Sequence, residues 1–260
     1  MPTAVFASDV HITSPDGDRG QLFTSFLKGL RAADGITHLY LLGDIFDLWV
    51  ADHRYFIERY PAIIDEIRRL VEEGVEVAYF EGNHDLYLKH FWQKDLGVTV
   101  FGGPTEVTLG NVRVRLEHGD QMDPDDTGYL FLRWFLRTGP IRFLTRHLPG
   151  SLITRIGERA SEKSRHYTSN TKTIASSDAV GKIRLHARKV HADRPFDLIV
   201  SGHVHVRDDT ELETGNGRFR SVNLGSWYDR PCYFRLSYGT LDEAEFVELG
   251  NDAPPMAAGA

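Results

Sequence analysis

The residues with the clearest chemistry in this sequence are aspartates, histidines and one asparagine that occur in five short clusters. One cluster, Ser201-Gly202-His203-Val204-His205, puts two imidazoles two positions apart, and on extended backbone such side chains point to the same side. Each cluster follows an apolar run, at the point where a strand ends and a loop begins, which is where α/β sheets present functional groups. The other four clusters are Asp9-Val10-His11, Gly43-Asp44-Ile45-Phe46-Asp47, Gly82-Asn83-His84-Asp85 and His118-Gly119-Asp120.

These clusters offer carboxylate, amide and imidazole groups but no thiolate. Such mixed ligands suit divalent ions such as Mn²⁺, Fe²⁺ or Zn²⁺ and differ from those of a structural cysteine-type zinc site. Seven candidate ligands are too many for one ion, and we expect Asp44 to bridge two. Two ions about 3.5–4 Å apart can hold a hydroxide and clamp a phosphoryl group for in-line attack, so no serine or cysteine nucleophile is needed. The candidate metal ligands are Asp9, His11, Asp44, Asn83, His118, His203 and His205.

The elements that must position these clusters are visible as apolar patterns. Apolar runs over residues 4–7, 38–42 and 75–80 predict buried strands, each followed by a cluster. Apolar residues at helical spacing predict one helix over 22–35 and another over 55–73. This alternation of strand and helix is typical of a parallel sheet that is covered on both faces.

After residue 98 the pattern changes. Gly110-Asn111 separates two short apolar runs, 107–109 and 112–116, and predicts a tight antiparallel hairpin. The sequence therefore predicts a two-sheet layered α/β domain over residues 1–250, with a helical insertion at 123–191 that forms a cap. Further strands are expected at 197–200, 210–213, 219–222, 233–237 and 245–249, and a flexible Pro/Ala/Gly-rich tail at 251–260.

The predicted insertion combines basic and apolar residues. Between Tyr129 and Lys172 there are nine arginines and lysines against two glutamates, with leucine, isoleucine and phenylalanine between them. Three interpretations remain open: a cap whose apolar side covers the core, an element that seats on anionic lipid, or a cap that binds an acyl chain and phosphates. Nucleic acid is not expected as a partner, because no nucleic-acid module is present and the whole chain carries a net charge of −7.

The composition is that of a globular protein, with 41% hydrophobic and 26% charged residues. Cys232 is the one cysteine, so no internal disulfide forms and a reducing compartment is expected. No export signal and no apolar run of the roughly 20 residues that a membrane span needs is visible. We therefore expect a cytoplasmic protein, with peripheral contact to the inner face of the plasma membrane left open.

Together the five clusters resemble the motifs of the calcineurin-like metallophosphoesterases. That resemblance implies a two-sheet metallophosphoesterase fold and two metal sites. It places His84 outside the coordination sphere, where it stabilises phosphoryl oxygens or protonates the leaving group, and Asp85 as the partner that orients His84. The implied ligands are Asp9, His11, Asp44 and His205 for one ion, and Asp44, Asn83, His118 and His203 for the other.

A narrower resemblance involves the segment after His118. Asp125-Asp126-Thr127-Gly128-Tyr129, an Arg/Phe/Leu-rich insert and a polar segment over 164–172 are similar to the UDP-2,3-diacylglucosamine hydrolases of lipid A biosynthesis. Members of that branch are peripheral inner-membrane enzymes that use Mn²⁺ and cleave a lipid-linked UDP-sugar to UMP and diacylglucosamine 1-phosphate. The implied substrate-contacting residues are Asp126, Ser164, Thr168 and Lys172.

One position departs from that branch, which carries arginine where this chain has His84. Arginine stays cationic and cannot donate a proton as histidine can, so the chemistry at this position differs. The alternative is a broader metallophosphoesterase that acts as a phosphodiesterase or phosphatase on another nucleotide or lipid-linked substrate. A non-enzymatic scaffold is disfavoured, because such scaffolds lose ligands and here none is missing.

Overall fold

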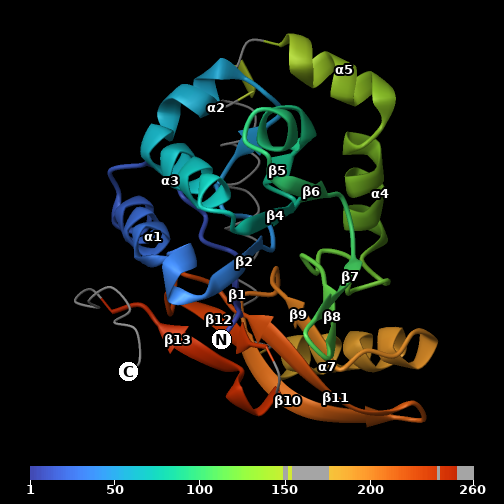
Figure 1. Ribbon diagram of the computed structural model, residues 1–260. Coiled ribbons are helices and arrows are strands. Elements are labelled where there is room, and N and C mark those ends of the chain that lie inside the picture. The colour runs from blue at the N-terminus through green and yellow to red at the C-terminus, as the bar shows by residue number, and fades with distance from the viewer. Residues whose placement is uncertain (149–151, 154–175, 239–240, 251–260) are drawn as a thin grey trace.

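The computed structural model describes residues 1–148, 152–153, 176–238 and 241–250. Two sheets form its centre, and Figure 1 shows helices on the outside of both. The larger sheet has the strand order β13-β12-β1-β2-β4-β6. Strands β1, β2, β4 and β6 are parallel, whereas β12 and β13 run antiparallel to their neighbours. Its strands are β1 (Thr3–Ala7), β2 (Ile36–Leu41), β4 (Glu76–Phe80), β6 (Thr99–Phe101), β12 (Cys232–Ser237) and β13 (Glu245–Glu248).

The second sheet has the order β10-β11-β9-β8-β7 and contains the predicted hairpin at Gly110-Asn111. Strand β9 pairs in parallel with both β8 and β11, which brings the His118 cluster beside the His203 cluster. The strands are β7 (Thr105–Leu109), β8 (Val112–Leu116), β9 (Leu198–Ser201), β10 (Arg207–Thr214) and β11 (Gly217–Leu224), and a separate pair joins β3 (Trp49–Val50) to β5 (Asp85–Leu86).

Strand β1 shows how the layers are held together. Ala4 and Phe6 point into the core between the two sheets, while Val5 and Ala7 point to the helices, because successive strand side chains alternate. All four are fully buried. The two-sheet α/β fold predicted from the sequence is confirmed.

The helices on the larger sheet are amphipathic. Helix α1 (Asp18–Gly29) buries Phe23, Phe26 and Leu27, and α3 (Pro61–Glu72) buries its isoleucines against the same core. The prediction of one continuous helix over 55–73 is wrong, because α2 (Arg54–Arg59) ends before Tyr60. Pro61 lacks the amide hydrogen of a helix interior and disfavours helical backbone in the preceding residue, so it starts a new helix instead.

The segment between the fourth and fifth clusters contributes helices α4 (Thr127–Leu136), α5 (Gly139–His147) and α7 (Ser176–Asp193). Helix α7 packs on β10 and β11, and Arg184 pairs with Asp208 there. Helix α5 contacts the loop after β3, where Arg146 Nη2 lies 3.2 Å from Asp52 Oδ2. No helix in the described ranges is both long and apolar enough to cross a bilayer. Residues Ser164, Thr168 and Lys172 and the tail 251–260 lie outside the described residues, so the domain limits stay a prediction.

Candidate metal centre and active site

The five clusters meet at the ends of β1, β2, β4, β8 and β9. Backbone hydrogen bonds tie their loops together: Asp9 N–H donates to the Gly43 carbonyl at 3.1 Å, and His11 N–H donates to the Asp44 carbonyl at 3.0 Å. Across the second sheet, Gly202 N–H donates to the His118 carbonyl at 2.9 Å. The side chains are therefore held by paired strand ends rather than by independent loops.

A first group of possible ligands consists of Asp9, His11 and His205. His205 Nε2 lies 3.3 Å and His11 Nε2 lies 3.9 Å from the same oxygen, Asp9 Oδ1. That oxygen is buried and accepts no hydrogen bond from the described part of the chain. An orphaned carboxylate oxygen that faces two imidazole nitrogens fits a divalent ion.

A second group consists of Asp44, His118 and His203, with Asn83 beside it. His118 Nδ1 donates to the Leu42 carbonyl at 2.7 Å, which leaves Nε2 as the nitrogen for a ligand. His118 Nε2 lies 3.5 Å from Asp44 Oδ2 and 3.3 Å from Asn83 Oδ1. Asp44 also groups with His11 and His84, so it lies between the two sets.

The backbone at these positions is unusual. Five of the seven candidate ligands have a positive φ: Asp9 at 51°, His11 at 50°, Asp44 at 53°, His203 at 68° and His205 at 57°. Left-handed backbone is strained for residues other than glycine, although aspartate and histidine adopt it more readily than most. Strain of this kind gathers where the surrounding structure holds functional groups in place. No local sequence pattern predicts this backbone conformation.

Two glycines allow the carboxylates to approach the loops. A Cβ on Gly82 would lie 2.1 Å from Asp44 Oδ1, and one on Gly202 would lie 2.3 Å from Asp9 Oδ2. The backbone at Gly202 therefore lies close to the candidate ligand Asp9, whose Oδ2 accepts from His203 N–H at 2.9 Å.

The electrostatics of the metal-free centre are compatible with cation binding. Burial lowers the pKa of His11 to about 3 and, together with the charge of His118, lowers the pKa of His203 to about 4, so both imidazoles are neutral ligands. Burial also acts to lower the pKa of His118, but Asp44 outweighs it and the pKa rises to about 10. Binding of an ion at His118 would therefore release a proton.

His84 and Asp85 do not pair as expected. Burial acts to lower the pKa of His84, but the charge of Asp44 outweighs it and raises the pKa. Its Nδ1 donates to the Asp47 carbonyl at 2.8 Å. Asp85 instead accepts from Ile45 N–H at 3.1 Å and from the Tyr79 hydroxyl at 2.8 Å. Asp85 begins β5, whereas His84 precedes that strand, and among the residues that the structure describes no hydrogen bond links the two side chains.

Asp85 therefore has a different role from the orienting role expected for it. Burial and the nearby charge of Asp44 raise the pKa of Asp85 to about 8. This carboxyl group holds the loop that carries Asp44, through Ile45, and Asp47 supplies the contact to His84. Asp47 belongs to the Gly43–Asp47 cluster of the sequence. Its contact to His84 is made by the backbone carbonyl, and the side-chain pattern of the cluster does not predict that contact.

Helix α4 reaches the second ligand group. Tyr129 and Arg133 both donate to Asp120 Oδ2, at 2.8 Å and 2.5 Å, and the Tyr129 ring lies 5.9 Å from the His203 ring. Arg137 donates to the Gly82 carbonyl at 3.3 Å. Asp126, expected to contact substrate, accepts from Tyr129 N–H and caps α4. The helix is thus joined to the loops that carry the candidate ligands.

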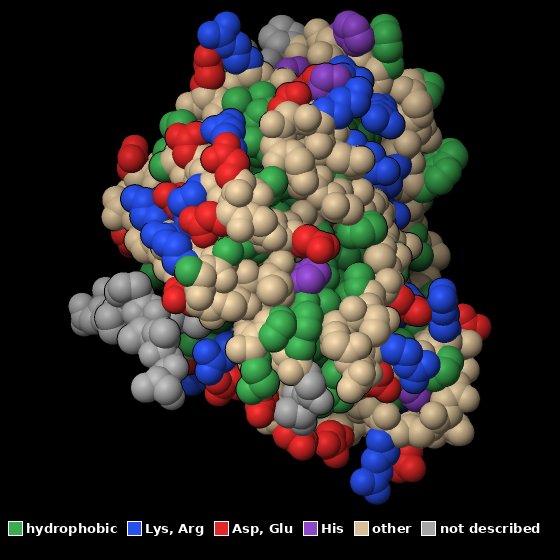
Figure 2. All heavy atoms as spheres, viewed as in Figure 1, with side chains coloured by type: hydrophobic (Ala, Val, Ile, Leu, Met, Phe, Trp, Pro, Cys, Tyr) green, Lys and Arg blue, Asp and Glu red, His purple; other side chains and the backbone are tan. Residues whose placement is uncertain are grey.

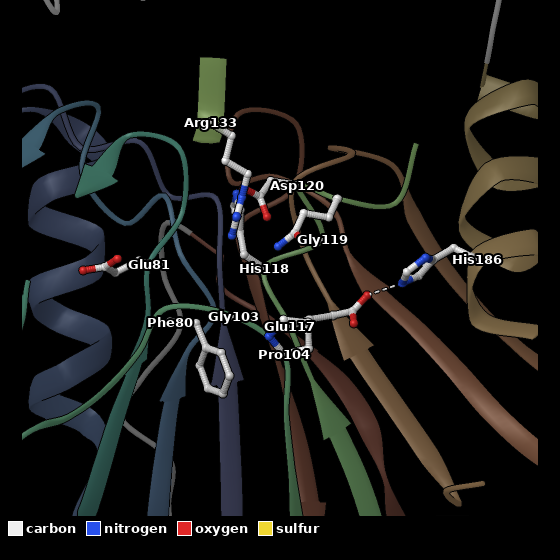
Figure 3. Close-up of a pocket in the computed structure, with 11 residues that line it drawn as sticks. Phe80, Glu81, Gly103, Pro104, Glu117, His118, Gly119, Asp120, Arg133 and His186 are labelled. Atoms are coloured by element: carbon white, nitrogen blue, oxygen red, sulfur yellow. Dashed lines mark hydrogen bonds and ion pairs between the residues drawn. The ribbon is translucent and has the colours of Figure 1, made fainter. Parts of the chain in front are cut away.

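A small solvent-open pocket lies beside His118 (Figure 3). Arg133 and Asp120 lie at one side of it and His186 of α7 at another, with Glu117 bonded to His186 at 2.6 Å. Helices α4 and α7 of the insertion therefore both contribute a residue to the pocket beside the second ligand group.

Comparisons with known proteins agree with this geometry. The family model described as calcineurin-like phosphoesterase matches residues 2–207. A UDP-2,3-diacylglucosamine hydrolase of Vibrio parahaemolyticus is 27% identical over 239 residues, which cover 90% of this chain and 94% of that protein. Proteins of the same name from Pseudomonas savastanoi and Pseudomonas putida are each 28% identical over 220 residues, which cover 85% of this chain and 86% and 89% of theirs.

Proposed function

Because the chain belongs to the calcineurin-like phosphoesterase family, we propose that this metal-dependent hydrolase cleaves the diphosphate of a lipid-linked UDP-sugar. The observation that carries the proposal is the position of Asp44, which groups with His118 and His203 and also with His11, a member of the first ligand group. The substrate class is supported by the similarity to UDP-2,3-diacylglucosamine hydrolases over most of the chain. The products would be UMP and diacylglucosamine 1-phosphate.

We assign the seven ligands to two divalent ions. Their mixed oxygen and imidazole groups suit Mn²⁺, Fe²⁺ or Zn²⁺, and Mn²⁺ is the proposed metal because the chain resembles a branch whose members use it. Bound there, the ions would supply a hydroxide nucleophile and neutralise phosphoryl charge. The ligands of the first ion would be Asp9, His11, Asp44 and His205, and those of the second Asp44, Asn83, His118 and His203.

His84 is the proposed proton donor to the leaving oxygen. Its Nδ1–H is held by the Asp47 carbonyl, so Nε2 is the free nitrogen. Burial acts to lower the pKa of His84, but Asp44 outweighs it and raises the pKa, which favours the protonated imidazole in the metal-free site. A positioned acid of this kind accelerates departure of a phosphate oxygen.

The cap supports a lipid-linked substrate. Along α4, Tyr129, Arg133 and Arg137 face the site loops, whereas Phe131 and Trp134 are 64% and 63% exposed. Figure 2 shows hydrophobic side chains standing out beside arginines and lysines on the side of the molecule where α4 and α5 lie. We propose that this surface contacts acyl chains and seats the enzyme on the inner face of the plasma membrane from the cytoplasm.

The substrate is tested with purified protein, Mn²⁺ and UDP-2,3-diacylglucosamine, with release of UMP as the measurement. UMP release that EDTA abolishes and Mn²⁺ restores is the expected result. Hydrolysis of bis(p-nitrophenyl) phosphate without any UMP release would reject the lipid substrate and favour a broader phosphodiesterase.

Membrane contact is tested by co-sedimentation with vesicles that contain anionic lipid. Phe143→Ser should weaken sedimentation, because Phe143 is 66% exposed on α5. Leu185→Ser is the matched control, since Leu185 is also exposed but lies on α7. Equal binding of the two variants would remove the surface formed by α4 and α5 from the membrane proposal.

A further inference from the structure

Arg19 and Tyr228 form a stacked pair beside the first ligand group. The Arg19 guanidinium carbon lies 3.7 Å from the centre of the Tyr228 ring. That ring lies 5.5 Å from the His11 ring and 6.4 Å from the His205 ring, and Tyr228 is 43% exposed. Helix α4 contacts the second ligand group instead, so the pair flanks a part of the site that α4 does not reach.

Both members of the pair are held by α1. Arg19 belongs to that helix, and Trp227, the neighbour of Tyr228, packs on Phe23 and Phe26 of the same helix. Trp227 N–H also donates to the Asp9 carbonyl at 3.2 Å. This hydrogen bond connects the segment that carries Tyr228 to the loop that carries Asp9, and so fixes the pair relative to the first ligand group.

The charge of Arg19 is not neutralised. Within the described residues it has no hydrogen bond or ion pair, whereas Arg133 is paired with Asp120. Stacking on an aromatic face holds a guanidinium without using its N–H donors in the ring plane. A guanidinium whose N–H donors are unpaired binds phosphate oxygens in a bidentate manner.

We propose that Arg19, positioned by Tyr228, binds the phosphoryl group of a diphosphate that is not attacked. The residue then selects diphosphates over phosphodiesters with a single phosphorus, because only a diphosphate has a second phosphoryl group to place there. This inference rests on the proposed function in that the substrate contains a diphosphate, but it does not require the lipid.

The experiment compares kcat/KM for the UDP-lipid with kcat/KM for bis(p-nitrophenyl) phosphate. Arg19→Ala should lower the ratio of the two by about tenfold or more, since it removes charge-assisted hydrogen bonds. Tyr228→Leu should lower the ratio as well, while Tyr228→Phe keeps the aromatic face and most of the selectivity. Arg68→Ala removes an equal charge on α3, where Arg68 pairs with Asp65, and should leave the ratio unchanged.

A second measurement separates this inference from the proposed function. Hydrolysis of bis(p-nitrophenyl) phosphate is inhibited with methylenediphosphonate and, separately, with methylphosphonate, both in excess Mn²⁺. Arg19→Ala should weaken inhibition by the diphosphonate about tenfold more than inhibition by the monophosphonate. That result supports the inference even if the wild-type protein releases no UMP. An equal effect on both inhibitors, or an effect on neither, overturns it.

Discussion

His11 Nε2 and His205 Nε2 lie 3.1 Å apart, although 194 positions separate the two residues. Burial lowers the pKa of His11 to about 3, so at neutral pH its imidazole carries no charge of its own. Two imidazole nitrogens that face the buried Asp9 carboxylate at this separation match the geometry of ligands around a cation. The consequences can be tested one side chain at a time.

Asp44→Asn should remove nearly all activity, by roughly 10³-fold or more, because it takes away the carboxylate that lies between the two ligand groups. The variant should also bind less of both ions, as measured by metal analysis after dialysis at a fixed Mn²⁺ concentration. Loss of a single equivalent, with the other retained, would show that Asp44 does not bridge.

His84→Ala should slow turnover by about 10²-fold and leave the metal content at the wild-type value. The reason is that His84 Nδ1 is bound to the Asp47 carbonyl and the role proposed for His84 is proton donation rather than coordination. If metal analysis showed the variant to be depleted, His84 would have to be counted among the ligands, as its place near His11 and Asp44 allows.

Gly202→Ala should lower metal affinity by about 10- to 100-fold, because a Cβ there would lie 2.3 Å from Asp9 Oδ2 and displace that carboxylate. Titration of the metal-free variant with Mn²⁺ measures this. The matched control is Gly181→Ala on α7, where a Cβ meets nothing within 4 Å. An alanine in that helix should raise stability by about 0.5–1 kcal/mol and leave affinity alone. Equal affinity of both variants would refute the close-approach argument.

His186→Ala should destabilise the protein by about 1–3 kcal/mol at pH 7, because buried Glu117 loses a hydrogen bond of 2.6 Å (Figure 3). Burial acts to raise the pKa of Glu117, but His186 and Arg115 outweigh it and lower the pKa from 4.5. The Glu117 carboxylate therefore stabilises the fold above pH 4.5, and this contribution is lost as the pH falls further.

The difference between wild type and His186→Ala should accordingly shrink below pH 4.5 in urea unfolding measured at several pH values. A difference that stays constant down to pH 3 would show that the pair contributes through packing alone.

The sequence predicted where the strands end and which polar clusters follow them. A buried strand requires an apolar run, and a polar cluster directly after that run marks the end of the strand. It also predicted that the clusters would meet, since parallel strands end at one edge. It did not predict the break between α2 and α3 at Pro61. The apolar pattern continues through both helices, but proline has no backbone N–H to donate in a helix interior.

The finer arrangement of the site was beyond the sequence for another reason. The left-handed backbone of Asp9 and His205 depends on pairing between distant loops, and no local pattern records it. The hydrogen-bond partner of His84 is the backbone carbonyl of Asp47. Every residue has such a carbonyl, so the sequence could not single it out, and the neighbouring carboxylate of Asp85 was predicted as the partner instead. Arg19 and Tyr228 lie 209 positions apart and belong to no recognised motif.

The first ligand group joins Asp9, at the end of the first strand, to His205, which follows β9. During translation, the first ligand group therefore cannot be complete until residue 205 has emerged from the ribosome. A shorter nascent chain contains Asp9 and His11 but lacks His205, so the full set of candidate ligands belongs to the finished fold.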